Sequence, residues 1–196
     1  MWIEKYKNSI VFLEIKNEKK DSCVGTGFYV GNGTIITAGH NLLPRLSINN
    51  MWIGNNALQS SKTNHIYEEG GIDVGIISVN NTSSFNDTWL PCQFRLPEIG
   101  EAVAAIGFPA LPQRHPSIVL HTGIVEALPV NYKGIRCIQV SFHSGGGLSG
   151  GPLLGKRGNV LGIMIENIFQ KAKDDVPSKS FGQAIPIEYS TRLDLL

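Results

Sequence analysis

Apolar positions along this chain come in short runs, and heptad repeats are absent. The runs are rich in β-branched and aromatic side chains, and turn-forming segments with glycine, asparagine or proline separate them. They occupy residues 9–16, 27–30, 34–37, 51–53, 74–79, 103–107, 118–125, 135–141, 160–166 and 181–185. Many short strands divided by turn signals predict an all-β protein, and the pattern alone fits either a sandwich or a barrel.

Two further segments organise the chain. Residues 186–196 are the best helix candidate, because Pro186 suits a first helical turn and several apolar residues after it can face the core. Residues 93–100 lie near the middle of the chain and contain a proline. They are expected to link two β-structured halves, residues 1–93 and 94–196, within one domain of ordinary size.

The composition is that of a folded domain with many turns. Of 196 residues, 42% are hydrophobic and 17% are charged, which allows a sizeable core and argues against a disordered chain. Glycine accounts for 22 residues, about 11%, against about 7% in average proteins. The formal net charge of +1 provides no basic field for nucleic acid or for anionic lipid.

The N-terminal segment and the cysteines both lead us to expect a cytoplasmic location. Charged residues within positions 4–14 and the short apolar run 10–13 do not fit a signal peptide, and no apolar run approaches the roughly 18 residues of a membrane span. Cys23, Cys92 and Cys137 are widely spaced and odd in number, which argues against a disulfide scaffold or a zinc site. We therefore expect a reducing compartment, no membrane association, no metal and no cofactor.

Two motifs place polar side chains at the ends of apolar strands. The sequence TAGH at residues 37–40 puts His40 directly after a strand, beside small residues that can leave its imidazole exposed. The sequence IDVGII at residues 72–77 puts Asp73 at the start of a very apolar strand, where a carboxylate is expensive to bury unless something hydrogen-bonds it. Orienting a histidine would meet that need. Taken singly, each motif has a simpler reading, as a packed or surface histidine and as a strand-start aspartate.

A third motif surrounds a serine with glycines. The sequence SGGGLSGGPLL at residues 144–154 places Ser149 between two glycine runs. Glycine lets the backbone adopt positive φ and pass close to a ligand. Two amides separated by one residue can then point at one spot, which is the arrangement of an oxyanion hole. A plain glycine-rich turn is the alternative reading of this motif by itself.

Together the three motifs are far more specific. His40, Asp73 and Ser149 follow the chain order of the chymotrypsin triad, with separations of 33 and 76 residues. At this point the chain resembles the chymotrypsin-like serine peptidases, and the HtrA/Deg type of protease domain most closely. The resemblance runs from residue 10 to the C-terminus and includes GTGFYV at 25–30, GEAVAAIGFP at 100–109, TGIV at 122–125, VLGI at 160–163 and GQAIP at 182–186.

The resemblance implies two packed six-stranded Greek-key β-barrels, with the active site in the cleft between them and a short C-terminal helix. His40 and Asp73 would come from the first barrel and Ser149 from the second. Ser149 would attack the peptide carbonyl, His40 would take and return its proton, and Asp73 would hold the imidazole. The backbone N–H groups of Gly147 and Ser149 would bind the oxyanion.

The resemblance also implies a primary specificity pocket. Its base would be His143, six residues before the nucleophile, and its walls would include Ile165, Glu166, Asn167 and Ala184. A histidine where trypsin-like specificity needs aspartate disfavours cleavage after lysine or arginine. His143 is either a recognition group for an acidic or amide side chain or a structural residue of the pocket. We expect Ile165 to narrow the pocket and to favour small apolar side chains.

Leu148 departs from the family pattern, in which aspartate or asparagine precedes the nucleophile. A leucine cannot pair with a newly cut N-terminus, so we predict no activation by N-terminal cleavage. Three successive glycines cost backbone entropy to order. We therefore expect the loop 144–148 to be incompletely formed at rest and to be ordered by a substrate or by a regulatory protein partner.

The expected function is that of a serine endopeptidase, which hydrolyses protein or peptide substrates through an acyl-enzyme. An intracellular protease with a narrow substrate range, such as a bacterial stress or defence effector, is a further expectation. The alternatives are a catalytically silent peptide-binding module, a protease-domain fragment of a larger protein and a structural or scaffold β-domain. The sequence leaves side-chain specificity and oligomeric state open.

Overall fold

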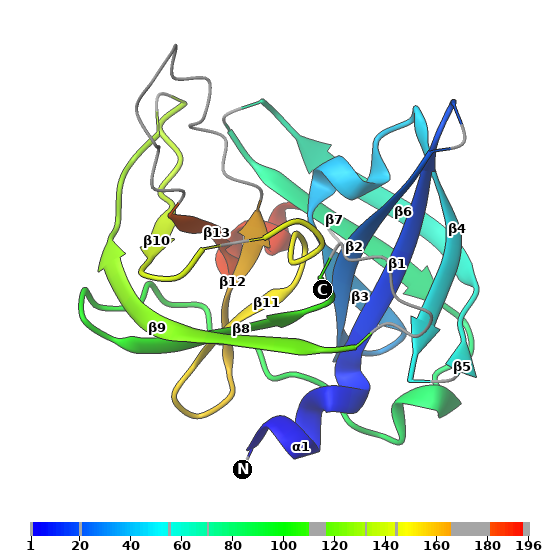
Figure 1. Ribbon diagram of the computed structural model, residues 1–196, viewed down its shortest axis with the longest axis horizontal. Coiled ribbons are helices and arrows are strands. Elements are labelled where there is room, and N and C mark those ends of the chain that lie inside the picture. Colours follow the sequence, from blue (N-terminus) through cyan, green and yellow to red (C-terminus); the bar gives the residue numbers. More distant parts are fainter. Residues whose placement is uncertain are drawn as a thin grey trace.

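The chain folds into two β-structured halves that lie side by side (Figure 1). The computed structural model describes residues 2–19, 21–54, 56–69, 71–109, 117–131, 133–143, 145–165 and 181–193. A short helix, α1 (Trp2–Tyr6), and a 3₁₀ turn, η1 (Lys7–Ser9), precede the first strand. Strands dominate the remaining elements, which confirms the predicted all-β fold class.

The N-terminal half is an antiparallel sheet of seven strands. In chain order they are β1 (Ile10–Asn17), β2 (Ser22–Gly31), β3 (Thr34–Thr37), β4 (Leu46–Ile53), β5 (Asn56–Ala57), β6 (Ser60–Tyr67) and β7 (Asp73–Val79). They are arranged as β5-β4-β1-β2-β3-β7-β6. The 3₁₀ turn η2 (Gly39–Leu42) follows β3, and η3 (Ser83–Phe85) follows β7. Because Thr37 is paired with Gly75, the residues after β3 lie beside the start of β7.

The C-terminal half is a closed barrel. Its strands are β8 (Ala102–Gly107), β9 (Val119–Ala127), β10 (Ile138–Val140), β11 (Pro152–Gly155), β12 (Val160–Ile165) and β13 (Gly182–Pro186). They are arranged as β10-β13-β12-β11-β8-β9. The 3₁₀ helix η4 (Ile187–Leu193) follows β13 and lies against β12 and β7, so it contacts both halves.

The apolar side chains of the strands fill three clusters. In β3, Ile35 packs inside the N-terminal sheet, whereas its neighbour Ile36 packs in a cluster that both halves share. In β8, Ala105 faces the barrel interior and Ile106 faces the shared cluster. Successive side chains of a strand point to opposite faces. Each half therefore fills its own interior with one face of its strands and contributes the other face to the junction.

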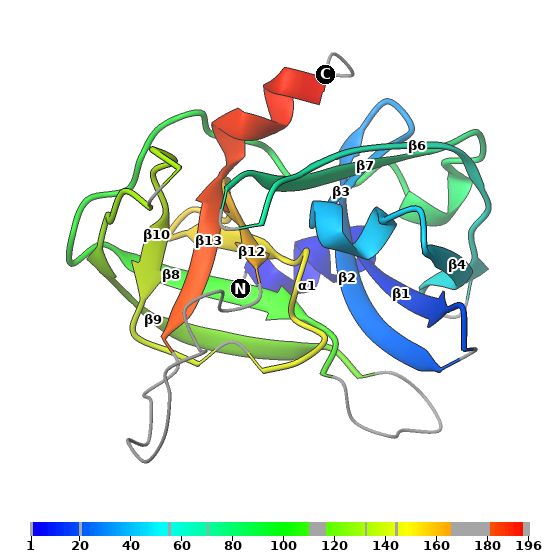
Figure 2. The ribbon, with the colours of Figure 1, turned by 90° about the horizontal axis from the view of Figure 1, so that it is seen from above.

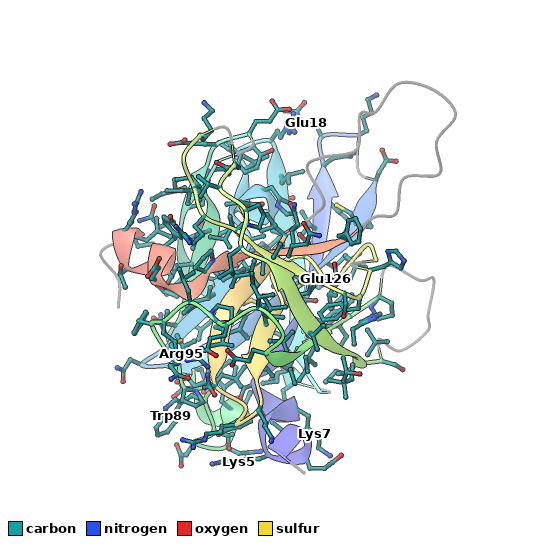
Figure 3. All side chains as sticks on the ribbon, turned by 90° about the vertical axis from the view of Figure 1, so that its left-hand side faces the viewer. Lys5, Lys7, Glu18, Trp89, Arg95 and Glu126 are labelled. Atoms are coloured by element: carbon teal, nitrogen blue, oxygen red, sulfur yellow. The ribbon has the colours of Figure 1, made fainter. Side chains whose placement is uncertain are left out.

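The segment of residues 88–100 joins the two halves along the outside of the barrel. Cys92 forms a parallel bridge with Val160, the first residue of β12. Arg95, labelled on this segment in Figure 3, donates hydrogen bonds of 2.8 and 2.6 Å to the two carboxylate oxygens of Glu101. The connection is thus fastened to the second half by backbone and side-chain bonds.

Three strands were not predicted from the sequence. Residues 60–67 form β6 although most of them are polar and exposed, because an edge strand needs no apolar alternation to pair with its neighbour. The strand β5 has only two residues, and β11 is a four-residue strand that begins with a proline next to the glycine motif. The N-terminal half consequently has seven strands where the resemblance implied six.

The predicted C-terminal helix is present, but it starts one residue later and is of the 3₁₀ type. Pro186 ends β13 and does not begin a helix, and the segment that follows is the 3₁₀ helix η4. Pro186 pairs with Gly162 of the neighbouring strand β12, so its extended backbone is fixed by the sheet. Residues 194–196 lie outside the described residues. Among the described helices, none has the length and the apolar composition that crossing a membrane requires.

Candidate active site

The turn η2, which carries His40, lies at the junction of the two halves (Figure 2). Gly39 makes this placement possible, because a Cβ at that position would lie 2.5 Å from the Ile66 carbonyl oxygen and 2.9 Å from that of Val74. A larger residue would push η2 away from β6 and β7. The glycine of the TAGH motif therefore allows η2 to pack closely on β6 and β7, and the histidine after it is held beside the start of β7.

Asp73, the first residue of β7, is 2% exposed and receives two hydrogen bonds from His40. Its Oδ1 accepts the backbone N–H of His40 at 2.8 Å, and its Oδ2 lies 2.6 Å from the His40 Nδ1. These bonds compensate the burial of the carboxylate, as the sequence argument required. They also fix the imidazole, whose side chain is 21% exposed.

Ser149 approaches the same imidazole from the other half. Its Oγ lies 2.8 Å from the His40 Nε2. Its carbonyl oxygen accepts hydrogen bonds from the N–H of Thr26 at 2.9 Å and from the Asn41 Nδ2 at 3.3 Å. The structure thus brings together the three side chains singled out in the sequence, in the order carboxylate, imidazole and hydroxyl.

The residues before Ser149 form a tight turn. The N–H of Leu148 donates to the Gly145 carbonyl at 3.3 Å, and Gly147 has φ +90°. A positive φ at the third position is the mark of a type II turn, which favours glycine there. Leu148 is 1% exposed and packs in the barrel interior. Within the described ranges, the N–H groups of Gly147 and Ser149 donate to no protein acceptor.

The residues that were predicted to form the specificity pocket lie in different surroundings. His143 is exposed, and Glu166 and Asn167 lie outside the described residues. Ala184 is fully buried in the barrel interior. Ile165 is buried in the cluster that both halves share, on the opposite face of its strand from Met164, and its part in a specificity pocket stays a prediction.

Two residues near the site were not predicted from the sequence. Met164 packs in the same cluster as Ala184, its cross-strand neighbour, because it alternates with Ile165 along β12. That alternation could have been read from the sequence. Tyr67 ends β6 opposite Asp73, and its ring meets the His40 ring edge-on with the centroids 6.3 Å apart. No sequence signal marked Tyr67, because its strand is mostly polar.

Metal-binding side chains do not cluster in the part of the chain that the structure describes: no three histidine, cysteine, aspartate or glutamate side chains converge there on one point that could hold a metal ion. Burial raises the pKa of the Cys92 thiol to about 12 and also raises the pKa of Cys137. These two thiols therefore stay protonated at neutral pH and have little nucleophilic character.

A hydroxyl, an imidazole and a carboxylate aligned across two packed β-structured halves define the class of the trypsin-fold serine peptidases. The family model described as the trypsin-like peptidase domain matches residues 25–163. The chain belongs to this family.

Comparison with individual proteins agrees with this assignment. A protein of Plasmodium falciparum (isolate 3D7) named "Serine protease DegP homolog" is 28% identical over 158 residues, which cover 78% of this chain and 17% of that protein. The chain therefore spans less than a fifth of the length of this relative. The relative's name supports the resemblance to the HtrA/Deg type.

Solved structures share the fold. The Rv3671c protease from M. tuberculosis, in its active form, superposes with a TM-score of 0.74 at 17% identity and covers 97% of this chain and 81% of that one. A serine endoprotease from Yersinia pestis gives a TM-score of 0.68 at 20% identity, over 97% of this chain and 62% of the other. At these identities the likeness concerns the fold alone.

Proposed function

We propose that this chain hydrolyses peptide bonds through a triad of Ser149, His40 and Asp73. The observation that carries the proposal is the continuous chain of short contacts from the Asp73 carboxylate through the His40 ring to the Ser149 hydroxyl. Two of these groups belong to the N-terminal half and one to the C-terminal half, so a substrate at the junction would meet Ser149 and His40, with the buried Asp73 behind the imidazole.

The geometry supports the following sequence of steps. Ser149 Oγ attacks the peptide carbonyl carbon while its proton passes to His40 Nε2, and the carbonyl oxygen becomes an oxyanion. Asp73 Oδ2 stabilises the imidazolium through the Nδ1–H. The imidazolium then protonates the amine that leaves, and an acyl-enzyme remains. Water, deprotonated by His40, attacks the ester and releases the acid product together with the free Ser149 hydroxyl.

The proposed oxyanion hole consists of the N–H groups of Gly147 and Ser149. The positive φ of Gly147 and the turn that ends at Leu148 support it. Such donors stabilise negative charge that develops only in the transition state, and loss of one costs about 10²–10³ in kcat. The expectation that a substrate or a partner must first order the loop 144–148 stays a prediction.

The finer parts of the proposal concern substrate and setting. We propose His143 as the base of the primary pocket, with Ala184 and Met164 in the pocket wall. We also propose that the substrates are proteins and that they are cleaved after residues that are not basic. No disulfide joins the three cysteines, all of which lie among the described residues, and this supports a reducing compartment. A stress or defence role stays a prediction.

The test is a cleavage profile on a diverse peptide mixture, with Ser149→Ala as the matched control. We expect the wild-type protein to cut internal bonds and the variant to cut none above background. Activity should fall as the medium is acidified, because a protonated His40 cannot accept the serine proton. Wild-type protein that binds peptides without cutting them, with or without candidate partners, would instead support the peptide-binding alternative.

A further inference from the structure

Thr26 connects the N-terminal sheet to the turn that carries the nucleophile. This residue of β2 is fully buried. Its hydroxyl donates to the Gly147 carbonyl oxygen at 2.6 Å and accepts the N–H of Phe108 at 3.0 Å. Its backbone N–H donates to the Ser149 carbonyl oxygen at 2.9 Å. One residue of the first half therefore holds two carbonyls of the nucleophile turn.

The carbonyl of Gly147 belongs to a peptide unit whose orientation affects both proposed oxyanion donors. The peptide plane between Gly147 and Leu148 separates the two peptides that carry the proposed oxyanion donors. A peptide unit is rigid, so fixing both its C=O and its N–H fixes its orientation. Thr26 holds the C=O, and the Gly145 carbonyl holds the N–H of Leu148. Without the Thr26 bond, only the turn hydrogen bond of Leu148 would hold this plane, and the glycines before it offer little resistance to rotation.

Thr26 is itself held in place. Its carbonyl oxygen accepts the Thr37 hydroxyl at 2.7 Å, and that hydroxyl accepts the Asn41 Nδ2 at 3.0 Å. The chain at Gly150 passes so close that a Cβ there would overlap the Thr26 carbonyl oxygen. Satisfied buried networks of this kind rigidify the groups that they join. The network spans from the segment before His40 to the serine turn.

We propose that Thr26, through its side-chain hydroxyl, is a positioning residue for the oxyanion hole. It holds the Gly147–Leu148 peptide in the orientation that turns the N–H groups of Gly147 and Ser149 toward one point. This role rests on the proposed function, and Thr26 acts through the turn without touching the substrate.

The test compares Thr26→Val, which removes the hydroxyl and keeps the shape, with Thr26→Ser, which retains the hydroxyl. Because the effect on the oxyanion donors is indirect, we expect Thr26→Val to lower kcat by about 10- to 100-fold, below the loss of a donor itself, with KM nearly unchanged. Thr26→Ser should recover most of the lost kcat. The acid limb of the pH profile should not move in either variant, because the contact between His40 and Asp73 is untouched.

The matched control is Ser190→Ala. Ser190 is also fully buried and donates to a backbone carbonyl, that of Ile187 at 2.7 Å, on η4. Its removal should lower thermal stability and leave kcat near the wild-type value. Each kcat is divided by the fraction of protein that a fluorophosphonate labels, so that partial misfolding of a variant does not count as lost turnover. Thr26→Ala serves as a second hydroxyl-free variant.

The results of these experiments distinguish failure of the Thr26 inference from failure of the proposed function. Wild-type kcat in Thr26→Val and Thr26→Ala overturns the inference, as does a Thr26→Ser protein as slow as Thr26→Val, or a control that loses as much kcat. A wild-type protein that neither reacts with the fluorophosphonate nor cuts peptides overturns the proposed function itself.

Discussion

The two halves of the molecule hold their parts of the site in different ways. His40 and Asp73 belong to neighbouring segments of one sheet, where β3 pairs with β7 and two hydrogen bonds join the residues directly. Ser149 sits on a glycine-rich turn whose carbonyls are bound by residues of the opposite half. The base and its carboxylate are therefore assembled within one half, whereas the nucleophile depends on the junction between the halves.

The difference shows which part of the site depends on contacts between the two halves. Substitutions around Asp73, at the start of β7, act on this directly bonded pair and should change proton transfer first, whereas β3 also reaches the serine turn through the Thr37 hydroxyl. Substitutions around the serine turn should change geometry first and proton transfer only as a consequence.

Removal of the imidazole should have the largest effect. His40→Ala is expected to lower kcat by about 10⁶, and the double variant with Ser149→Ala should be no worse, because the triad acts as a unit. Steady-state hydrolysis of a fluorogenic peptide measures both. His65→Ala, on the exposed strand β6, is the control and should retain activity. Losses that multiply in the double variant would contradict a shared mechanism.

Loss of charge at the carboxylate should have a smaller effect. Asp73→Asn keeps the shape but favours the wrong imidazole tautomer, so kcat should fall by about 10⁴. The same peptide assay measures it, and circular dichroism checks that the sheet is intact. The exposed Asp21→Asn serves as the matched control. An Asp73→Asn protein with wild-type kcat would show that Asp73 has only a structural role.

The apolar anchor of the serine turn should matter for both stability and turnover. Leu148→Ala is expected to cost about 2–5 kcal/mol of unfolding free energy, because a buried side chain is removed from the barrel interior. It should also lower kcat, since the turn loses its hold on the barrel. Leu161→Ala, in the same cluster, should destabilise similarly and leave kcat of the folded fraction unchanged. Urea titration and active-site titration separate the two effects, and equal kcat in both variants would contradict the anchoring role.

The ion pair on the connecting segment should give the smallest effect. The hydrogen bond and the charge of Arg95 hold the pKa of the Glu101 carboxyl below its ordinary value. A pKa that is lower in the folded state stabilises the fold above the unfolded-state pKa, and the gain is lost as the pH falls through the folded-state value. Because the pair is partly exposed, Glu101→Gln should cost only about 0.2–1 kcal/mol at neutral pH and nothing at low pH. Urea unfolding across this pH range measures it, and a cost that grows at low pH would contradict the assignment.

How far the sequence predicts the site depends on how local each signal is. His40, Asp73 and Ser149 stand out because a polar residue at the end of an apolar strand, or within glycines, is locally unusual. Thr26 carries no such mark: its hydroxyl bonds Gly147, 121 residues away in the chain, and only packing of the halves reveals it. The edge strand β6 was missed for a related reason, since its pairing with β7 replaces the apolar alternation that prediction relies on.

The most direct test of the account is to map the residue that a fluorophosphonate modifies in the folded protein. Mass spectrometry of the digested adduct should find a single modified residue, Ser149, with the label lost in Ser149→Ala and strongly slowed in His40→Ala. A label on another serine, or undiminished peptide hydrolysis by the Ser149→Ala protein, would contradict the claim that the aligned carboxylate, imidazole and hydroxyl form the catalytic centre.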